Sequence, residues 1–181
     1  SRILIDNVAK TDAFVTQRLR DAGAVFMGKL STYEFALGGP CFDLPWPPAR
    51  NPWNREHFCG GSSSGSGAAT AAGFLPAAIG TDTGGSVRNP ATMCGVVGMK
   101  PTYGVVSRSG VVPLAFSLDH VGPLTRGVKD NAIMLDTIAG HDPHDPGSVK
   151  SASSGYASGI ESGIKGMRIG VLRHFYNKDM V

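Results

Sequence analysis

The sequence predicts an α/β fold in which helices cover a mixed β-sheet. Two observations support this class. Short apolar runs typical of buried strands alternate along the chain with segments of helical periodicity. In addition, Val, Ile and Ala surround many of the 25 glycines, a composition that favours tight turns between packed elements over disorder. The chain contains no internal repeat.

The first part of the chain is predicted to hold two helices and one strand. A helix is expected over 11–22, capped by Thr11 and ended by a glycine. Residues 24–27 are predicted to form a short buried strand. Residues 31–34 have the form of a capping box and predict a second, short helix. Prolines and aromatic residues dominate 38–53, which predicts a long ordered loop.

The remainder of the chain is predicted to alternate helices and strands. The expected elements are a helix of small residues over 68–72, a strand over 77–80, a tight loop over 81–86, strands over 95–99 and 104–106, a helix over 128–139, a polar surface connection over 150–166 and a strand over 166–172. Both ends of the chain are expected to be cut. The sequence begins at Ser1 without a methionine, and it stops soon after the last predicted strand begins.

Charge and cysteine usage exclude several classes of function. The formal net charge of +3 is small and the basic residues are scattered, which argues against direct nucleic-acid binding. No apolar run has the length of a membrane span. The three cysteines lack the spacing of zinc ligands, so we expect no metal site, and free thiols in a reducing cytoplasm.

The stretch CGGSSSGSGAATAAG, residues 59–73, has the composition of a flexible linker. However, it leads into a predicted helix of very small residues and then into a buried strand. A helix of that kind can pack close to neighbouring backbone, and its N-terminal N–H groups would favour an anion. The stretch is therefore predicted to be an ordered loop.

Three familiar motifs match this region only in part. Residues 61–65 fit the G-x-S-x-G nucleophile elbow, but the polar segment 55–59 precedes them where an apolar strand is required. The phosphate-binding P-loop needs a Gly-Lys-Ser/Thr sequence, which is missing here. Residues 82–84 read Asp-Thr-Gly, but the second Asp-Thr-Gly of an aspartic protease does not occur.

Two seryl loops taken together suggest a different chemistry. Residues 83–86, Thr-Gly-Gly-Ser, place consecutive backbone N–H groups before a serine, as an oxyanion hole for acyl transfer requires. A serine hydroxyl is a poor nucleophile unless another group takes its proton. No histidine lies near Ser86 in the sequence, but the loop that contains Ser62 could supply a second hydroxyl.

Four segments of the chain resemble the amidase signature family. They are residues 60–67, 80–88, 94–104 and 117–126, and the likeness extends over roughly residues 10–145. The paired seryl motifs at this spacing are highly specific. The resemblance implies the amidase signature fold, of which residues 1–181 would form the core portion of a single domain. It also implies a reaction that needs neither a metal nor an organic cofactor.

By the same resemblance, the enzyme uses a Ser–Ser–Lys triad. Ser86 would be the nucleophile. Ser62, after a cis peptide bond from Gly61, would pass the proton of Ser86 to a buried neutral lysine. The oxyanion hole would be formed by the N–H groups of Thr83, Gly84 and Gly85.

The lysine of this triad is not expected within the chain. By the resemblance it lies in a Lys-Asp segment upstream of Ser1. Lys129 and Asp130 imitate that segment, but they fall in a predicted outer helix, so Lys129 is interpreted as a solvated charge. The chain also departs from the commonest family pattern at Cys59 and Ser64, and neither departure touches the serines expected to react.

Other polar residues near the two loops are assigned structural or site-shaping roles. Ser63 is interpreted as a structural hydroxyl that could help to shape the site. Arg88 either forms a structural ion pair with Asp82 or shapes the site, and both alternatives stand. Asp119 and His120 are expected to hold the fold.

The resemblance predicts an amidase that hydrolyses a carboxylic amide to an acid and ammonia or an amine through an acyl-serine. Its partner would be a small-molecule amide, and a homo-oligomer is left open. One alternative is the glutaminase subunit of a tRNA-dependent amidotransferase, although residues 38–48 look more like stand-alone amidases. The other alternative is a truncated, inactive chain without enzymatic function.

Overall fold

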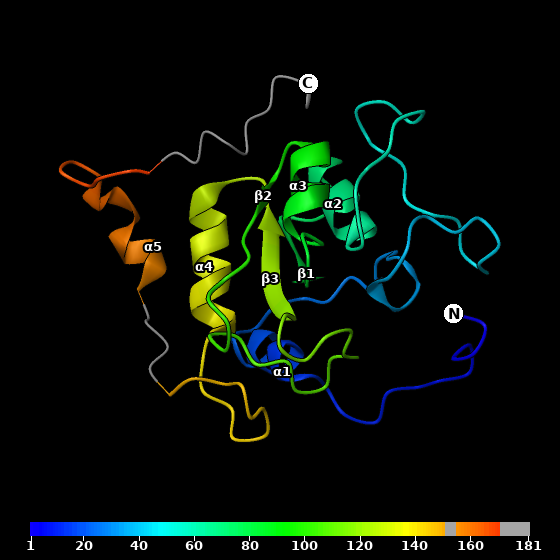
Figure 1. Ribbon diagram of the computed structural model, residues 1–181, viewed down its shortest axis with the longest axis horizontal. Helices are drawn as coiled ribbons and strands as arrows, with labels where there is room; N and C mark the ends of the chain where they lie inside the picture. The colour runs from blue at the N-terminus through cyan, green and yellow to red at the C-terminus, as the bar shows by residue number, and fades with distance from the viewer. Residues whose placement is uncertain (151–154, 171–181) are drawn as a thin grey trace.

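The computed structural model describes residues 1–150 and 155–170, and Figure 1 shows their arrangement. Three strands form one sheet in the order β1-β3-β2: β1 (Ala77–Asp82), β2 (Val97–Gly98) and β3 (His120–Thr125). Both pairs of strands are antiparallel. The α/β class is thus confirmed. The parallel pairs that a mixed sheet needs are not among those formed by the described residues.

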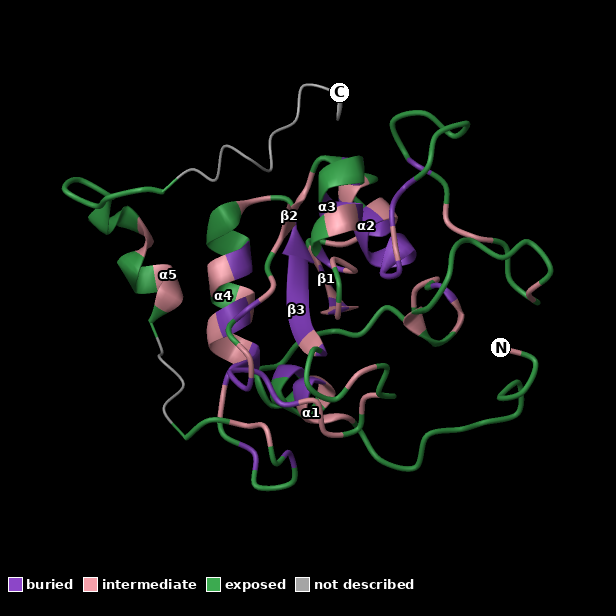
Figure 2. Ribbon diagram, in the orientation of Figure 1, coloured by how far each residue is buried: buried purple, intermediate pink, exposed green. Residues whose placement is uncertain are grey.

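Helices lie to either side of these strands. The helix α4 (Val128–Ile138) packs against β3, and α2 (Ser64–Ala71) packs against β1 (Figure 1). The helix α3 (Arg88–Cys94) contacts both α2 and β2. Figure 2 shows that β3 is buried along most of its length, so the middle of the sheet lies at the centre of the described structure.

Two apolar clusters form the core. The larger joins the first helix, α1 (Phe14–Asp21), to α4, β3 and the 105–106 segment. Its buried members are Val15, Leu19, Val105, Val106, Val121, Leu135, Ile138 and Ala139. The smaller cluster contains Val87, Ala91 and Leu124, and it packs α3 against β3. Since α3 closely follows Ser86, the second seryl loop is attached to this part of the core.

The helix predicted over 11–22 is confirmed as α1, with a later start. Its N-cap residue is Ala13, which makes no side-chain cap hydrogen bond, so the role assigned to Thr11 was wrong. Instead, the first free N–H group, that of Phe14, donates to the Ser109 carbonyl at 3.0 Å. A tertiary contact thus replaces the expected side-chain cap.

The two elements predicted next along the chain differ from expectation. Residues 24–27 form no strand, and Val25 and Met27 are 84% and 75% exposed. No strand of the described structure pairs with this segment, so its apolar side chains stay in solvent. The capping-box helix is reduced to a 3₁₀ turn, Glu34–Ala36, whose N-cap residue is Tyr33 and which has no side-chain cap hydrogen bond.

The short strands predicted over 95–99 and 104–106 are only partly present. The first is reduced to the two residues of β2. The second is a turn, in which Val105 N–H donates to the Thr102 carbonyl. Its valines nevertheless lie in the larger core cluster. The apolar pattern therefore predicted burial correctly and secondary structure incorrectly.

The central strand, β3, was not predicted. It contains Pro123, and proline is normally confined to sheet edges because it has no N–H to donate. The register explains why it is tolerated here. Pro123 faces Ile79, which directs its carbonyl away from β3 to the Ser66 hydroxyl. Its carbonyl accepts hydrogen bonds from Met99 N–H at 3.1 Å, just after β2, and from the Asn131 side chain at 3.2 Å, and neither bond needs an N–H from residue 123.

Towards the end of the chain, the helix predicted over 128–139 is confirmed as α4. The polar connection expected over 150–166 includes a short helix, α5 (Tyr156–Gly159), followed by a 3₁₀ turn, Ile160–Ser162. The strand predicted over 166–172 has no regular structure up to residue 170, and its last two residues lie outside the described ranges.

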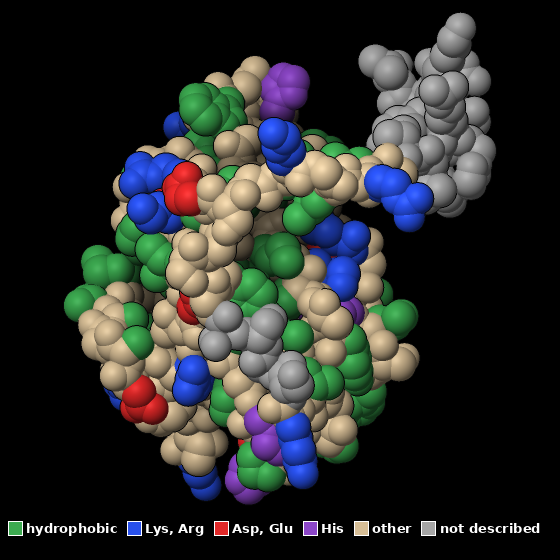
Figure 3. Space-filling view, turned by 90° about the vertical axis from the view of Figure 1, so that its left-hand side faces the viewer, with side chains coloured by type: hydrophobic (Ala, Val, Ile, Leu, Met, Phe, Trp, Pro, Cys, Tyr) green, Lys and Arg blue, Asp and Glu red, His purple; other side chains and the backbone are tan. Residues whose placement is uncertain are grey.

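Two observations concern the classes of function that the sequence argued against, nucleic-acid binding and membrane spanning. On the face shown in Figure 3, Lys and Arg side chains are dispersed among polar and hydrophobic ones and form no continuous basic patch. Within residues 1–150 and 155–170, no helix has both the length and the apolar character needed to cross a membrane.

Candidate active site

The Ser/Gly stretch forms an ordered loop followed by a helix, as predicted. The helix α2 begins at Ser64, earlier than expected, and therefore includes part of the Ser/Gly sequence itself. Four serines here are buried, with exposed fractions of 2–5%: Ser62, Ser63, Ser64 and Ser66. The peptide bond between Gly61 and Ser62 is cis, as the family resemblance implied.

Three of these four serine hydroxyls are engaged with backbone groups. The Ser63 hydroxyl accepts a hydrogen bond from Thr81 N–H at 3.1 Å and donates to the Thr81 carbonyl at 3.2 Å. The Ser66 hydroxyl donates to the Ile79 carbonyl at 2.8 Å, and that of Ser64 donates to the Ser31 carbonyl at 3.3 Å. Within the described part of the chain, the Ser62 hydroxyl has no such hydrogen bond. The contacts of Ser63 are those of a structural hydroxyl, whereas Ser62 keeps its hydroxyl available.

The N-terminus of α2 is less open to an anion than the sequence suggested. The N–H of Gly65 donates to the Ser31 carbonyl at 2.7 Å. The N–H of Ser63, at the N-cap, donates to the Ser86 carbonyl at 3.2 Å. Protein carbonyls thus already occupy these two donors, and the predicted anion site is corrected accordingly.

The two seryl loops meet in the structure. The hydrogen bond from Ser63 N–H to the Ser86 carbonyl joins the residue after Ser62 directly to Ser86. Ser62 is 3% exposed and Ser86 is half-buried. Among the residues that the structure describes, no hydrogen bond joins the two hydroxyls. The proton relay between them therefore stays a prediction.

Two residues that the sequence reasoning missed hold the Gly60–Ser62 backbone. Tyr33 N–H donates to the Ser62 carbonyl at 3.0 Å, and the Asn89 side-chain oxygen accepts from Gly61 N–H at 3.0 Å. Gly60 adopts a positive φ of 75°, and a Cβ there would lie 2.6 Å from the Pro90 Cα. The loop backbone is therefore fixed from two sides, and glycine is required where it passes α3.

The turn after β1 is held by an ion pair between Asp82 and Arg88. The Asp82 carboxylate is fully buried and accepts hydrogen bonds from the Arg88 guanidinium at 2.9 and 3.0 Å. It also accepts from three backbone N–H groups, those of Gly85, Val87 and Arg88, at 2.8–3.3 Å. Burial alone would raise the pKa of Asp82, but these donors outweigh it and lower the pKa to about 2. The structural ion pair considered for Arg88 is thus present.

The three residues assigned to the oxyanion hole are not equivalent. Gly85 N–H donates to Asp82 at 2.8 Å, so that group is already engaged. The N–H groups of Thr83 and Gly84 have no hydrogen-bond partner within residues 1–150 and 155–170. The Thr83 hydroxyl donates to the Asp119 carboxylate at 2.5 Å. Of the three assigned residues, Thr83 and Gly84 therefore keep N–H groups that an oxyanion could use in this conformation.

Asp119 and His120 are engaged in structural contacts, as expected. The second oxygen of the Asp119 carboxylate accepts from the N–H groups of Leu114 and Ala115, each at 2.8 Å. The His120 ring nitrogen Nδ1 lies 2.6 Å from the Leu118 carbonyl, which requires a proton on Nδ1. Its other ring nitrogen lies 3.2 Å from the Lys100 ammonium.

No lysine of the described ranges hydrogen-bonds to Ser62. Lys129 is exposed on α4, in agreement with its interpretation as a solvated charge. The Lys100 ammonium donates to the Pro101 carbonyl at 3.1 Å, in addition to its contact with His120. Lys178 lies outside the described residues.

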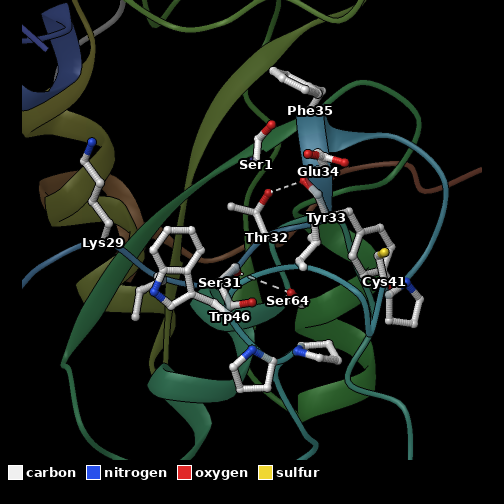
Figure 4. Close-up of a pocket in the computed structure, with 15 residues that line it drawn as sticks. Ser1, Lys29, Ser31, Thr32, Tyr33, Glu34, Phe35, Cys41, Trp46 and Ser64 are labelled. Carbon is white, nitrogen blue, oxygen red and sulfur yellow. Dashed lines mark hydrogen bonds between the residues drawn. The ribbon is translucent and has the colours of Figure 1, made fainter. Parts of the chain in front are cut away.

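A cavity of about 690 Å³ lies beside the first seryl loop. Figure 4 shows that Tyr33, Glu34 and Phe35 contribute to its wall, with Trp46 and Cys41 from the proline-rich loop and Ser64 from the start of α2. Neither Ser62 nor Ser86 lines it. The cavity therefore does not mark the position of the two serines that are predicted to react.

Two glycine-rich seryl loops are joined here beside a turn with unpartnered backbone N–H groups, which is the arrangement that serine-dependent acyl transfer requires. Comparison with known proteins specifies the family. The family model described as Amidase matches residues 1–180. The chain belongs to this family, the amidase signature family, as its motifs predicted.

Curated relatives support the assignment. The chain is 51% identical to the A subunit of the glutamyl-tRNA(Gln) amidotransferase of Moorella thermoacetica, over 99% of this chain and 37% of the relative. It is 52% identical to the protein of the same name from Anaeromyxobacter sp., over 97% of this chain and 36% of the relative. The chain thus spans little more than a third of the length of these relatives.

Solved structures show the same fold. The corresponding glutamyl-tRNA(Gln) amidotransferase protein of Thermotoga maritima is 48% identical and matches with a TM-score of 0.86, over 92% of this chain and 37% of that one. The peptide amidase of Stenotrophomonas maltophilia is 40% identical and matches with a TM-score of 0.74, over 83% of this chain and 33% of that one. Both kinds of enzyme considered from the sequence are therefore among the structures it resembles.

Proposed function

We propose that the protein hydrolyses a carboxylic amide to a carboxylic acid and ammonia or an amine, through an acyl group carried on Ser86. One observation carries this proposal. The Ser63 N–H to Ser86 carbonyl hydrogen bond brings the two seryl loops together, and Ser62 is the buried serine of its loop whose hydroxyl is not engaged with described backbone groups. Membership of the Amidase family supports the same chemistry.

In the proposed reaction, the Ser86 hydroxyl oxygen attacks the amide carbonyl carbon while its proton passes to Ser62. Ser62 in turn gives its own proton to the neutral lysine expected of the family. The N–H groups of Thr83 and Gly84 stabilise the negative carbonyl oxygen of the tetrahedral intermediate. The intermediate then breaks the C–N bond, and the leaving nitrogen takes up the proton. Water hydrolyses the resulting ester and restores Ser86.

His120 and Asp119 are not assigned as a catalytic couple. The Asp119 carboxylate binds Thr83 and two backbone N–H groups, and the His120 Nδ1 proton is directed to the Leu118 carbonyl. Neither group is oriented towards the other as in a Ser-His-Asp triad. Their contacts support the structural role expected from the sequence.

The amidase subunit of an amidotransferase is a second candidate, in which the amide would be the side chain of glutamine. The names of the curated relatives at 47–52% identity favour it. It would also place the chain in an assembly with other subunits, whereas a stand-alone amidase could act alone or as a homo-oligomer. A cytoplasmic location, proposed from the three free cysteines, suits both candidates.

The test is to measure ammonia or amine release by the complete protein from a panel that includes glutamine, propionamide, benzamide and an amino-acid amide. Wild-type protein should release product, and Ser86→Ala should not. A fluorophosphonate should label Ser86. Release from glutamine alone, raised by partner subunits, would select the amidotransferase. Release from simple amides without partners would select the stand-alone amidase. Wild-type activity in Ser86→Ala would overturn both, and no release from any amide by wild-type protein would favour the non-enzymatic alternative.

A further inference from the structure

The turn between β1 and the second seryl loop is attached to the protein by two carboxylates, one on each side. Asp82, the last residue of β1, binds the far part of the turn through Gly85 and Arg88. Asp119, which directly precedes β3, binds Thr83. Asp82 and Asp119 lie at the same end of the antiparallel pair, since Asp82 faces His120 in the register.

Asp119 is well suited to fix the orientation of the Thr83 side chain. It is only 9% exposed, and no salt bridge within the described ranges neutralises its carboxylate. One oxygen accepts the Thr83 hydroxyl and the other accepts two consecutive backbone N–H groups, those of Leu114 and Ala115. All three donors bind one carboxyl group, so Asp119 is held in place by the two N–H groups on one side and directs the Thr83 side chain on the other.

The position of Thr83 gives this contact a functional meaning. Thr83 and Gly84 carry N–H groups of the turn that remain without a partner among the described residues. The glycines that follow Thr83 have no side chain through which they could be fixed. The rotation of the peptide plane that presents these N–H groups is therefore controlled by Asp82 at one end and by the Thr83 side chain at the other.

We propose that Asp119 is a positioning residue for the oxyanion hole and acts through the Thr83 hydroxyl. The inference rests on the proposed function, because it assumes that an oxyanion forms beside Ser86. Loss of the Thr83–Asp119 hydrogen bond should leave substrate binding nearly unchanged and weaken stabilisation of the transition state. The expected signature is a lower kcat with little change in KM.

The central test compares Thr83→Val, which removes the hydroxyl at constant shape, with Thr83→Ser, which keeps a hydroxyl. In the complete protein, Thr83→Val should lower kcat by about tenfold or more and change KM by less than about threefold, since loss of a whole oxyanion donor costs about 10²–10³. Thr83→Ser should recover most of the lost kcat. Thr137→Val is the matched control, because the Thr137 hydroxyl donates to a helix carbonyl in α4, away from the turn.

Asp119→Asn and the double variant complete the test. An asparagine cannot accept from both sides of the Asp119 site at once, so the Thr83 hydroxyl proton loses its acceptor and kcat should fall. If the two residues act through one hydrogen bond, adding Thr83→Val to Asp119→Asn should cause no further loss. If Asp119→Asn does not fold, the Thr83 pair alone decides the question.

The outcomes separate this inference from the proposed function. Wild-type kcat in Thr83→Val, or losses that multiply in the double variant, would overturn the positioning role while Ser86→Ala remains inactive. Activity that survives Ser86→Ala would overturn the proposed function instead. A KM raised in proportion to the fall in kcat/KM, with kcat unchanged, would also reject the positioning role, because it would show a loss of ordinary substrate binding.

Discussion

The Asp82→Asn substitution should lower both the stability of the protein and the order of the second seryl loop. The Asp82 carboxylate is fully buried, and its donors lower its pKa from 3.8 to about 2. A shift of that size corresponds to roughly 2.5 kcal/mol. The Arg88 side chain is 52% exposed, so solvent screens part of the attraction. We therefore expect a loss of about 2 kcal/mol in the free energy of unfolding at neutral pH.

The loss should depend on pH in a defined direction. Because the pKa of Asp82 is lower in the folded protein than in the unfolded chain, the carboxylate stabilises the folded state above its ordinary pKa. This contribution fades as the pH falls towards 2. At a pH of about 3 the difference between wild type and variant should be about half its neutral value.

Urea unfolding, followed by circular dichroism at neutral and acidic pH, measures this difference. Asp43→Asn is the matched control, since it removes the same charge from an exposed side chain. The reasoning is refuted if Asp82→Asn costs less than about 0.5 kcal/mol at neutral pH, the usual range for a surface change. It is also refuted if the cost is the same at both pH values.

Three further predictions concern other parts of the molecule. Ser62→Ala should lower turnover by at least about 10² while Ser86 stays in place, as expected for loss of a general acid–base step, and steady-state rates test this. Asp145→Asn should lower the free energy of unfolding by about 2 kcal/mol at neutral pH and by less in acid. The reason is the ion pair with Arg108, in which both side chains are nearly buried and which lowers the pKa of Asp145 to about 2. A loss that does not depend on pH in urea unfolding would contradict this prediction. Residues 1–181 alone should show no Ser86-dependent amide hydrolysis, since no described lysine contacts Ser62; measurable hydrolysis would show that another group accepts the proton.

How far the sequence predicted the fold depended on whether each pattern was local. The helices α1 and α4 were predicted because their apolar residues repeat on one face, and that periodicity is contained within the segment. Apolar runs such as 24–27 and 104–106 show a tendency to be buried but do not reveal a pairing partner. Strand pairing is non-local, so one of these runs became a buried turn and the other an exposed segment. The central strand was missed for the same reason. Its Pro123 has no N–H to donate, and only the register shows that no donor is needed at this position.

The candidate site shows the same division. Ser62, Ser86 and the Asp82–Arg88 pair were recognised because they lie within compact motifs. The roles of Tyr33 and Asn89 were not, since each holds the Gly60–Ser62 backbone from about 30 residues away, through a peptide N–H in one case and a side-chain amide in the other. Neither contact leaves a signal in a single sequence. The engagement of Gly85 with Asp82 likewise depends on the detailed turn geometry rather than on residue type.

The serine-rich start of α2 also affects how β1 behaves towards other chains. In the described structure, the side of β1 away from β3 presents the polar backbone groups of Ile79 and Thr81, which on an open edge could recruit a foreign strand. The Ser63 and Ser66 hydroxyls bind these groups in place of a neighbouring strand. Two small side chains thus complete the hydrogen bonding of this edge beneath α2, and replacing both with alanine would leave partly buried backbone groups of β1 without partners. A sequence with the composition of a flexible tether protects a sheet edge.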